Sequence, residues 1–142
     1  MPRKSSEADI ADFAHAVGLF MRRMRAAAGS HEISWTEAAV LARLDRNGPA
    51  TTADLARAEG MKPQSMGTTI AALEERGLVE RTPHPKDGRQ VNIALTAKGA
   101  ALRKQRGDEK RTWLAHAISQ LDDAERKALF AAGGIIKRLA EK

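Results

Sequence analysis

The 142-residue sequence contains no cysteine, and this absence excludes several classes of protein. Without thiols the chain can form no disulfide framework, no cysteine-ligated zinc or iron–sulfur site and no thiol redox sensor. Apolar runs are short as well: none approaches the ~18 residues of a membrane-spanning helix, and no apolar stretch follows Met1-Pro2-Arg3-Lys4. We therefore expect no membrane association, no signal peptide and a cytoplasmic location.

Patterns that support catalysis or metal binding are also missing. The sequence shows no nucleophile–base pair, no glycine-rich phosphate loop and no cluster of metal ligands. Its four histidines lack H-x-x-x-H spacing; they are His15, His31, His84 and His116. The sequence predicts neither an enzyme nor a metal site nor a cofactor.

Net charge gives a weak indication of the partner. With 24 Lys and Arg against 18 Asp and Glu, the chain carries +6 and has a pI near 10.1, which fits a polyanionic partner. Residues 97–142 hold most of the excess, with eleven basic and six acidic side chains. Charge alone therefore does not locate a nucleic-acid site.

The two ends of the chain have helical periodicity. Apolar residues recur at three- and four-residue steps in 8–28; they are Ile10, Phe13, Val17, Phe20, Met21 and Met24. Thr96 can cap a long helix to about residue 119, and the capping box Asp122-Asp123-Ala124-Glu125 opens a last helix to about 139. We expect the apolar side chains of this last helix to be buried: Leu129, Phe130, Ile135, Ile136 and Leu139. Gly133-Gly134 interrupts it and predicts a kink or a close helix contact.

The middle of the chain begins with three short helices. Ser34 and Glu37 have capping-box spacing and open a helix that Asn47-Gly48-Pro49 ends. Helices over 52–59 and 63–76 follow, separated by a turn with Gly60, which is the helix-turn-helix arrangement. In the second of these helices the inward stripe is Met66, Ile70 and Leu73, Pro63 takes the first position and Gly77 ends it.

After Gly77 the hydrophobic period changes to two. Residues 78–81 and 91–95 read as strands, and the loop between them, 82–90, contains two prolines and Asp-Gly. This pattern predicts an exposed β-hairpin. The sequence thus predicts a mainly α fold with a small β-hairpin wing: a winged helix-turn-helix inside a helical dimerisation frame.

Three motifs in this order resemble the MarR family, the multiple-antibiotic-resistance regulators. They are Leu73-Glu74-Glu75-Arg76-Gly77-Leu78-Val79-Glu80-Arg81, then Asp87-Gly88-Arg89, then Leu95-Thr96-Ala97-Lys98-Gly99. The resemblance runs from about residue 8 to 140. It implies one intertwined domain over 1–142, with a dimerisation region at 8–30 and 97–140 and a DNA-binding lobe at 34–96. It also implies a homodimer on pseudo-palindromic duplex DNA, with recognition helix 63–76 in the major groove and wing 82–90 in the minor groove.

The outward face of the predicted recognition helix carries short polar groups. The DNA-binding residues expected there are Pro63, Gln64, Ser65, Thr68 and Thr69. Gln64 could bond adenine N6 and N7, and the threonines could contact a thymine methyl or a phosphate. Many members of the family carry an arginine near the position of Thr68; its absence here predicts either softer specificity or specificity that rests more on the wing. The alternative for this face is a solvated surface.

The wing carries the stronger local signal. Gly88 permits a tight turn close to DNA, and Arg89 is long enough to enter a narrow minor groove. Asp87 is expected to hold Arg89 through a charge-assisted pair, and Lys86 and His84 to contact phosphate. Thr51 or Thr52 at the start of helix 52–59 could direct N–H groups to a phosphate, but a plain helix cap is an equal alternative.

The resemblance further implies release of DNA when a small aromatic or phenolic acid binds. The candidate pocket wall is Phe20, Met24, Trp35 and Trp113, and the candidate anion anchors are His31, Arg43 and His116. Such residues at helical spacing are more often core, and aromatic residues are only 4% of this chain. The effector site therefore stays one of two interpretations.

Taken together, these patterns predict a dimeric, ligand-responsive transcriptional regulator, with repression favoured over activation. The alternative is a winged-helix protein-interaction module without specific DNA binding. This alternative rests on two observations. The charge of residues 62–90 is nearly balanced, with five basic against four acidic side chains, and the arginine near Thr68 is missing. The two hypotheses differ in whether the protein retards duplex DNA at low salt.

Overall fold

A computed structural model describes residues 4–29 and 33–142, and the chain divides into two compact units. The winged unit is Gly29–Gly107, and the helical unit is Met1–Ala28 together with Asp108–Lys142. The division falls inside one continuous helix, α5 (Ala97–Ser119). The sequence placed the lobe boundary between residues 96 and 97, so the winged unit extends further along α5 than that boundary.

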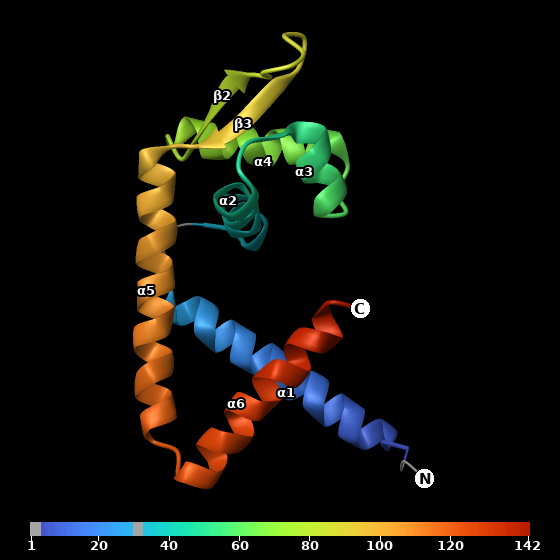
Figure 1. Cartoon of the computed structure of the whole chain (residues 1–142), viewed down its shortest axis with the longest axis vertical. Helices are drawn as coiled ribbons and strands as arrows, with labels where there is room; N and C mark the ends of the chain where they lie inside the picture. The colour runs from blue at the N-terminus through green and yellow to red at the C-terminus, as the bar shows by residue number, and fades with distance from the viewer. Residues whose placement is uncertain (1–3, 30–32) are drawn as a thin grey trace. The chain divides into compact units, whose positions relative to one another are not determined.

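The winged unit contains a helix-turn-helix and a β-hairpin (Figure 1). Its elements in order are α2 (Trp35–Asn47), β1 (Ala50–Thr51), α3 (Thr52–Ala58), α4 (Pro63–Glu75), β2 (Val79–Pro83), β3 (Val91–Leu95) and the first half of α5. The strands form an antiparallel sheet in the order β1-β3-β2, in which Ile93 pairs with both Ala50 and Arg81. Sequence reasoning missed β1, because two residues are too few to show alternation.

Strand β2 begins one residue later than predicted and runs on to Pro83, which pairs with Val91. Proline is tolerated there because β2 lies at an edge of the sheet and needs no donor on its outer side. The predicted helix limits hold to within a residue or two. Gly48, Gly60 and Gly77 all have positive φ, as helix-ending and turn glycines should.

The core of the winged unit is closed and apolar. Its buried apolar side chains come from α2, α3, α4, β2 and β3 and from the flanking Ile33 and Leu78; the largest are Leu41, Leu55, Met66, Ile70, Leu73, Leu78 and Ile93. The predicted inward stripe of α4 is therefore confirmed, because Met66, Ile70 and Leu73 are all fully buried. With that side of α4 packed, its other side must face outward.

The start of α5 is fastened to the end of α4 by Thr96. The Thr96 N–H donates to the carbonyl of Leu78 at 3.1 Å, and its hydroxyl donates to the carbonyl of Gly77 at 2.6 Å. The same hydroxyl accepts the N–H of Gly99 at 3.0 Å, which caps α5. A Cβ on Gly99 would lie 2.2 Å from the Leu78 carbonyl oxygen, so only glycine fits. We call these four residues the α4–α5 junction.

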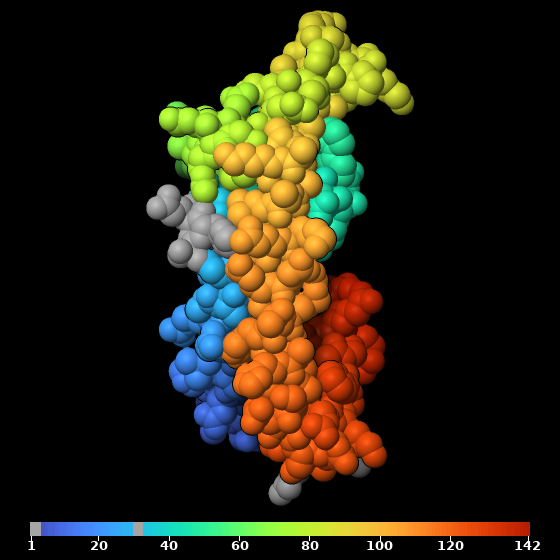
Figure 2. Space-filling view, turned by 90° about the vertical axis from the view of Figure 1, so that its left-hand side faces the viewer, coloured from blue at the N-terminus to red at the C-terminus, as the bar shows by residue number. Residues whose placement is uncertain are grey.

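The helical unit holds α1 (Glu7–Ala27), the second half of α5 and α6 (Asp123–Ala140). In Figure 2 this half of α5 lies in front, with α1 and α6 on either side of it. Ser6 caps α1 by accepting the Asp9 N–H at 3.0 Å, and the predicted Asp122–Glu125 capping box of α6 is confirmed. None of the residues of α1 or α6 is buried.

The expected burial of the α6 stripe is therefore wrong for the single chain. The five residues are between 39% and 63% exposed: Leu129, Phe130, Ile135, Ile136 and Leu139. On α1 the predicted stripe is open too, and Ile10, Phe13, Phe20 and Met21 are exposed. Within residues 4–29 and 33–142, these side chains stay largely open to solvent. Helix α6 is continuous through Gly133-Gly134, so the predicted interruption does not break it, and nothing lies within 4 Å of a Cβ placed on Gly133.

None of the helices in the described part of the chain combines the length and hydropathy needed to cross a membrane. No group of three or more His, Asp or Glu in residues 4–29 and 33–142 could hold a metal ion.

Candidate nucleic-acid interface

The interface is built on the turn between α3 and α4. Thr51 caps α3 by accepting the Asp54 N–H at 3.1 Å, and the Met61 N–H closes the turn on the Ala56 carbonyl at 2.8 Å. The Thr51 hydroxyl therefore has the plain capping role, one of the two predicted alternatives. Thr52 is half-buried as the first residue of α3.

Asp54 balances the charge at this end of α3. Its carboxylate accepts from the Arg57 guanidinium at 2.6 Å. The hydrogen bond from Arg57 and then that from the Thr51 side chain hold the pKa of the Asp54 carboxyl below its ordinary value. A carboxylate so placed at a helix start also complements the helix dipole.

Helix α4 presents an uncharged polar face. Pro63, Gln64, Ser65 and Thr68 are exposed, whereas Thr69 is half-buried. The hydroxyls of Thr68 and Thr69 each donate to the carbonyl four residues earlier, at 3.3 Å. Because these hydroxyl protons are used within the helix, the threonines offer outward a methyl group and an acceptor rather than a donor.

Four further exposed or half-buried positions on α4 were missed by the sequence reasoning. Ala71 and Ala72 are exposed apolar residues next to the polar face, and Lys62 is the exposed N-cap residue. Gly67 is half-buried, and a Cβ placed on it would meet nothing within 4 Å. A glycine inside a helix costs about 1 kcal/mol relative to alanine, and nothing in the described fold requires it here. Neither helical periodicity nor turn chemistry marks such a position.

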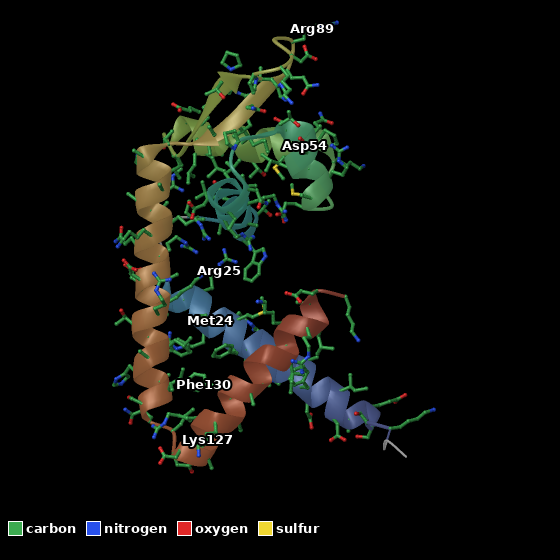
Figure 3. The ribbon with its side chains drawn as sticks, in the orientation of Figure 1. Met24, Arg25, Asp54, Arg89, Lys127 and Phe130 are labelled. Atoms are coloured by element: carbon green, nitrogen blue, oxygen red, sulfur yellow. The ribbon has the colours of Figure 1, made fainter. Side chains whose placement is uncertain are left out.

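The wing is tied to α4 through the sheet. Arg81 on β2 places its Nε 3.2 Å from the Glu74 carboxylate of α4. Strand β3 pairs with β2 along the whole length of both strands, so this ion pair connects the whole hairpin to α4. Figure 3 shows Arg89 at the tip of this hairpin, pointing away from the rest of the unit.

Asp87 acts on the backbone of Arg89 more than on its guanidinium. The Asp87 Oδ1 accepts the Arg89 N–H at 3.0 Å but lies 3.7 Å from the Arg89 Nε, beyond hydrogen-bond distance. The Arg89 side chain is 97% exposed. The expected charge-assisted pair is therefore a loose ion pair, and the guanidinium is presented to solvent. Lys86 is exposed beside it, whereas His84 is half-buried and bonded within the wing.

The candidate effector residues fall in both units. In the helical unit the rings of Phe20 and Trp113 are 6.1 Å apart, and the Arg23 guanidinium lies 4.7 Å above the Trp113 ring. Met24 and His116 belong to the same unit. Arg43, an expected anion anchor in the winged unit, is already paired with Glu59 at 3.0 Å.

Trp35 is 52% exposed in the winged unit, and His31 lies outside the described residues. The structure thus brings together two of the predicted wall residues and adds Arg23, which the sequence did not single out. Nothing in its spacing distinguishes Arg23 from the neighbouring arginines of α1.

The basic residues of α5 in the winged unit have internal partners. Lys98 donates from Nζ to the Arg76 carbonyl at 2.8 Å, and Arg103 pairs with Asp45 at 2.8 Å. Arg106 is buried. Lys98 thereby provides a hydrogen-bond donor to a carbonyl at the end of α4.

Known proteins resemble this chain in both sequence and fold. The family model for the MarR family matches residues 33–91. The HTH-type transcriptional regulator MT0903.1 of Mycobacterium tuberculosis is 34% identical over 131 residues, 92% of each chain. The HTH-type transcriptional repressor Rv2887 of the same species is 30% identical over 102 residues, 71% of this chain and 73% of the relative.

The fold is shared with a solved structure. The crystal structure of RV1404 from Mycobacterium tuberculosis superposes with a TM-score of 0.85 at 25% identity, covering 98% of this chain and 97% of the other. The sequence relatives and the shared fold agree with the three motifs found in the sequence. The chain belongs to the MarR family of helix-turn-helix transcriptional regulators, and it is not an enzyme.

Proposed function

We propose that the chain is a ligand-responsive repressor that binds a pseudo-palindromic DNA duplex as a homodimer. The observation that carries this proposal is the wing tip, where Arg89 is 97% exposed on a hairpin joined to the polar face of α4. A guanidinium at a hairpin tip, exposed to solvent and only loosely ion-paired with Asp87, is suited to a narrow minor groove, where the negative potential is strongest. The repressor-named relative supports the direction of regulation.

Helix α4 is proposed to read the major groove. Gln64 is exposed and can bond bidentately to adenine. Since the hydroxyl protons of Thr68 and Thr69 are used within the helix, methyl contact with thymine is favoured over donation to phosphate. Ala71 adds apolar surface on the exposed side. The resulting preference is for A·T pairs.

Gly67 gives this helix its closest approach to DNA in the proposed complex. The glycine has no packing role, since a Cβ there would meet nothing within 4 Å. Its cost in helix stability therefore needs a reason outside the winged unit. Contact between the α4 backbone and the DNA supplies one.

Three exposed residues are proposed to contact phosphates: Ser65 in the first turn of α4, the N-cap residue Lys62, and Lys86 in the wing. Such contacts fix register and add salt-dependent affinity without reading sequence. Thr51 and Thr52 would serve the same purpose through the backbone of α3.

The second copy of the chain is proposed to cover the apolar faces of α1 and α6. These faces expose Ile10, Phe13, Ile135, Ile136 and Leu139 and bury nothing within the chain. A palindrome requires two-fold symmetry, and a two-fold interface uses the same patch on both copies. Gly133 and Gly18, with open space at their Cβ positions, allow helices of two chains to approach closely.

A small aromatic or phenolic acid is proposed to weaken DNA binding through the helical unit. The Phe20 and Trp113 rings supply an apolar face, and the Arg23 guanidinium supplies a carboxylate partner. Titrating the protein with a hydroxybenzoate and following tryptophan fluorescence tests this, with Arg23→Gln as the variant that should lose the response. A response unchanged by that variant would assign the acid to another site.

The central test is selection of genomic fragments by the purified protein at low and moderate salt. The proposal expects enrichment of a palindrome whose half-site centres lie about one helical turn, ~34 Å, apart. Affinity should fall steeply with salt, and Arg89→Ala, which removes one cation from each copy of the dimer, should reduce the salt slope by about 2. Retention of all fragments alike would indicate an unspecific binder. Retention of none at low salt would favour a protein-interaction module.

A further inference from the structure

His84 occupies an unusual position in the wing. Its ring Nδ1 accepts two backbone hydrogen bonds, from the Lys86 N–H at 3.1 Å and from the Asp87 N–H at 3.2 Å. Side chains that accept from the residues two and three positions ahead organise tight turns, and Asn, Asp, Ser and Thr usually do this. Here an imidazole takes that role.

The two hydrogen bonds define the form of the ring. An imidazole nitrogen can accept only when it carries no proton, so the Nδ1 of His84 is unprotonated. The proton of the neutral ring then lies on Nε2. The turn therefore selects one of the two neutral tautomers, and a proton added to Nδ1 would remove the acceptor of both N–H groups.

The same turn presents Arg89. Asp87, whose N–H bonds to His84, accepts the N–H of Arg89 through Oδ1 at 3.0 Å. The His84 N–H donates to the Gln90 carbonyl at 3.1 Å, and the Gln90 N–H returns to the Asp87 carbonyl at 3.0 Å. His84 thus starts a short chain of hydrogen bonds that ends at the backbone of Arg89.

We propose that His84 is a positioning residue for Arg89: through Nδ1 it orders the turn that presents the guanidinium, rather than contacting phosphate itself. This inference rests on the proposed DNA-binding role of the wing. It replaces the phosphate contact expected for His84 from sequence, and it makes the Nε2–H tautomer a requirement for full DNA affinity.

Two amide substitutions separate positioning from phosphate contact. The Oδ1 of His84→Asn can take the place of Nδ1 and accept both N–H groups, whereas the amide of His84→Gln reaches toward the place of Nε2. We expect His84→Asn to bind the selected duplex within about twofold of wild type and His84→Gln to bind about threefold to tenfold more weakly. The opposite ranking, or equal affinities for both variants, would overturn the positioning role.

A double substitution gives an independent readout. If His84 acts through Arg89, then His84→Gln should weaken binding in the wild-type background but not in the Arg89→Ala background. Additive losses would assign His84 a direct contact of its own. Thermal unfolding of each variant checks that the winged unit is folded.

The tautomer can be observed without DNA. Two-bond ¹H–¹⁵N correlation spectra of the free protein at slightly alkaline pH should show His84 with an unprotonated Nδ1 and a protonated Nε2. A mixture of tautomers, or a proton on Nδ1, would contradict the inference. This result does not depend on DNA binding, so it separates failure of the positioning role from failure of the proposed function.

Discussion

The two units of the chain differ in how far they bury their apolar side chains. In the winged unit, apolar residues from three helices and two strands are buried against one another, and Leu55, Met66 and Ile93 are fully covered. In the helical unit, α1 and α6 bury no residue, and Ile10 and Leu139 are more than half exposed. One unit completes its core by itself, whereas the other has an apolar surface that needs a partner.

This difference shows what a hydrophobic stripe means in a sequence. The stripes of α1, α4 and α6 have the same three- and four-residue spacing, but only that of α4 is covered within the chain. Exposed apolar faces of this extent mark interaction sites in soluble proteins. The predictions below test the comparison between the units, from the largest expected effect to the smallest.

Ile136→Asp should break the proposed dimer. Two-fold symmetry places the substitution twice in one interface, and each carboxylate would lose water without gaining a partner. We expect the dimer dissociation constant to rise about a thousandfold, roughly 4 kcal/mol, measured by analytical ultracentrifugation. Lys127→Asp, an exposed change on the same helix away from this stripe, is the control. A variant that stays dimeric at nanomolar concentration would show that the α6 stripe is not the interface.

Gly99→Ala should destabilise the winged unit by about 3 kcal/mol, because the new Cβ would lie 2.2 Å from the Leu78 carbonyl oxygen. Gly67→Ala is the matched control, since a Cβ there meets nothing within 4 Å and helix propensity should add about 1 kcal/mol of stability. Urea unfolding measures both. Equal stabilities of the two variants would contradict the close contact between Gly99 and Leu78 in the α4–α5 junction.

Gly67→Ala also tests the surface of the winged unit. The added methyl should weaken binding to the selected duplex by about tenfold, because it would meet the DNA while leaving the fold intact. A gain in stability with unchanged affinity would show that the α4 backbone does not approach DNA closely at this point.

Arg89→Ala should lower affinity for the selected duplex by ~1–3 kcal/mol, roughly fivefold to 150-fold, with unchanged thermal stability. Its side chain is 97% exposed, so the substitution removes no contact that contributes substantially to folding stability. Arg111→Ala removes the same charge from the helical unit, where that arginine pairs with Asp108, and should change affinity far less. Equal losses would reduce the role of Arg89 to its contribution to net charge.

Asp54→Asn should have the smallest effect, a small loss of stability above about pH 5 that disappears in acid. The folded-state pKa of Asp54 is lowered, chiefly by the Arg57 hydrogen bond, so the carboxylate stabilises the folded state above its unfolded pKa. This contribution is present from about pH 5 upward and is lost as pH falls through the lowered folded-state value. The variant should therefore show a flatter stability profile below about pH 5 in pH-dependent unfolding. A profile parallel to that of wild type would show that the Asp54–Arg57 pair contributes nothing.

Local chemistry made much of the fold predictable. The capping boxes at Ser34 and Asp122, the proline at the start of α4 and the glycine after its end all hold in the structure. Each acts over three or four residues, so the sequence contains the whole interaction. The motif around Gly99 could be recognised in the same way, but its cause could not.

Contacts between segments that are distant in sequence could not be predicted. Lys98 reaches the Arg76 carbonyl, and Arg81 on β2 reaches Glu74 on α4; both are pairings of tertiary structure. The acceptor role of His84 depends on backbone geometry at Lys86 and Asp87, which residue types alone do not define. Burial of the α6 stripe failed as a prediction because periodicity cannot tell a core from a partner surface.

The bond from Lys98 to the end of α4 has an electrostatic consequence. Its ammonium offsets part of the negative pole of the helix dipole, whereas the first turn of α4 carries no carboxylate and follows the N-cap residue Lys62. The helix therefore acts as a one-sided source of positive potential directed out of its amino end. An approaching polyanion is attracted by this field before any contact forms, so salt should slow the association rate of DNA as well as weaken the final complex.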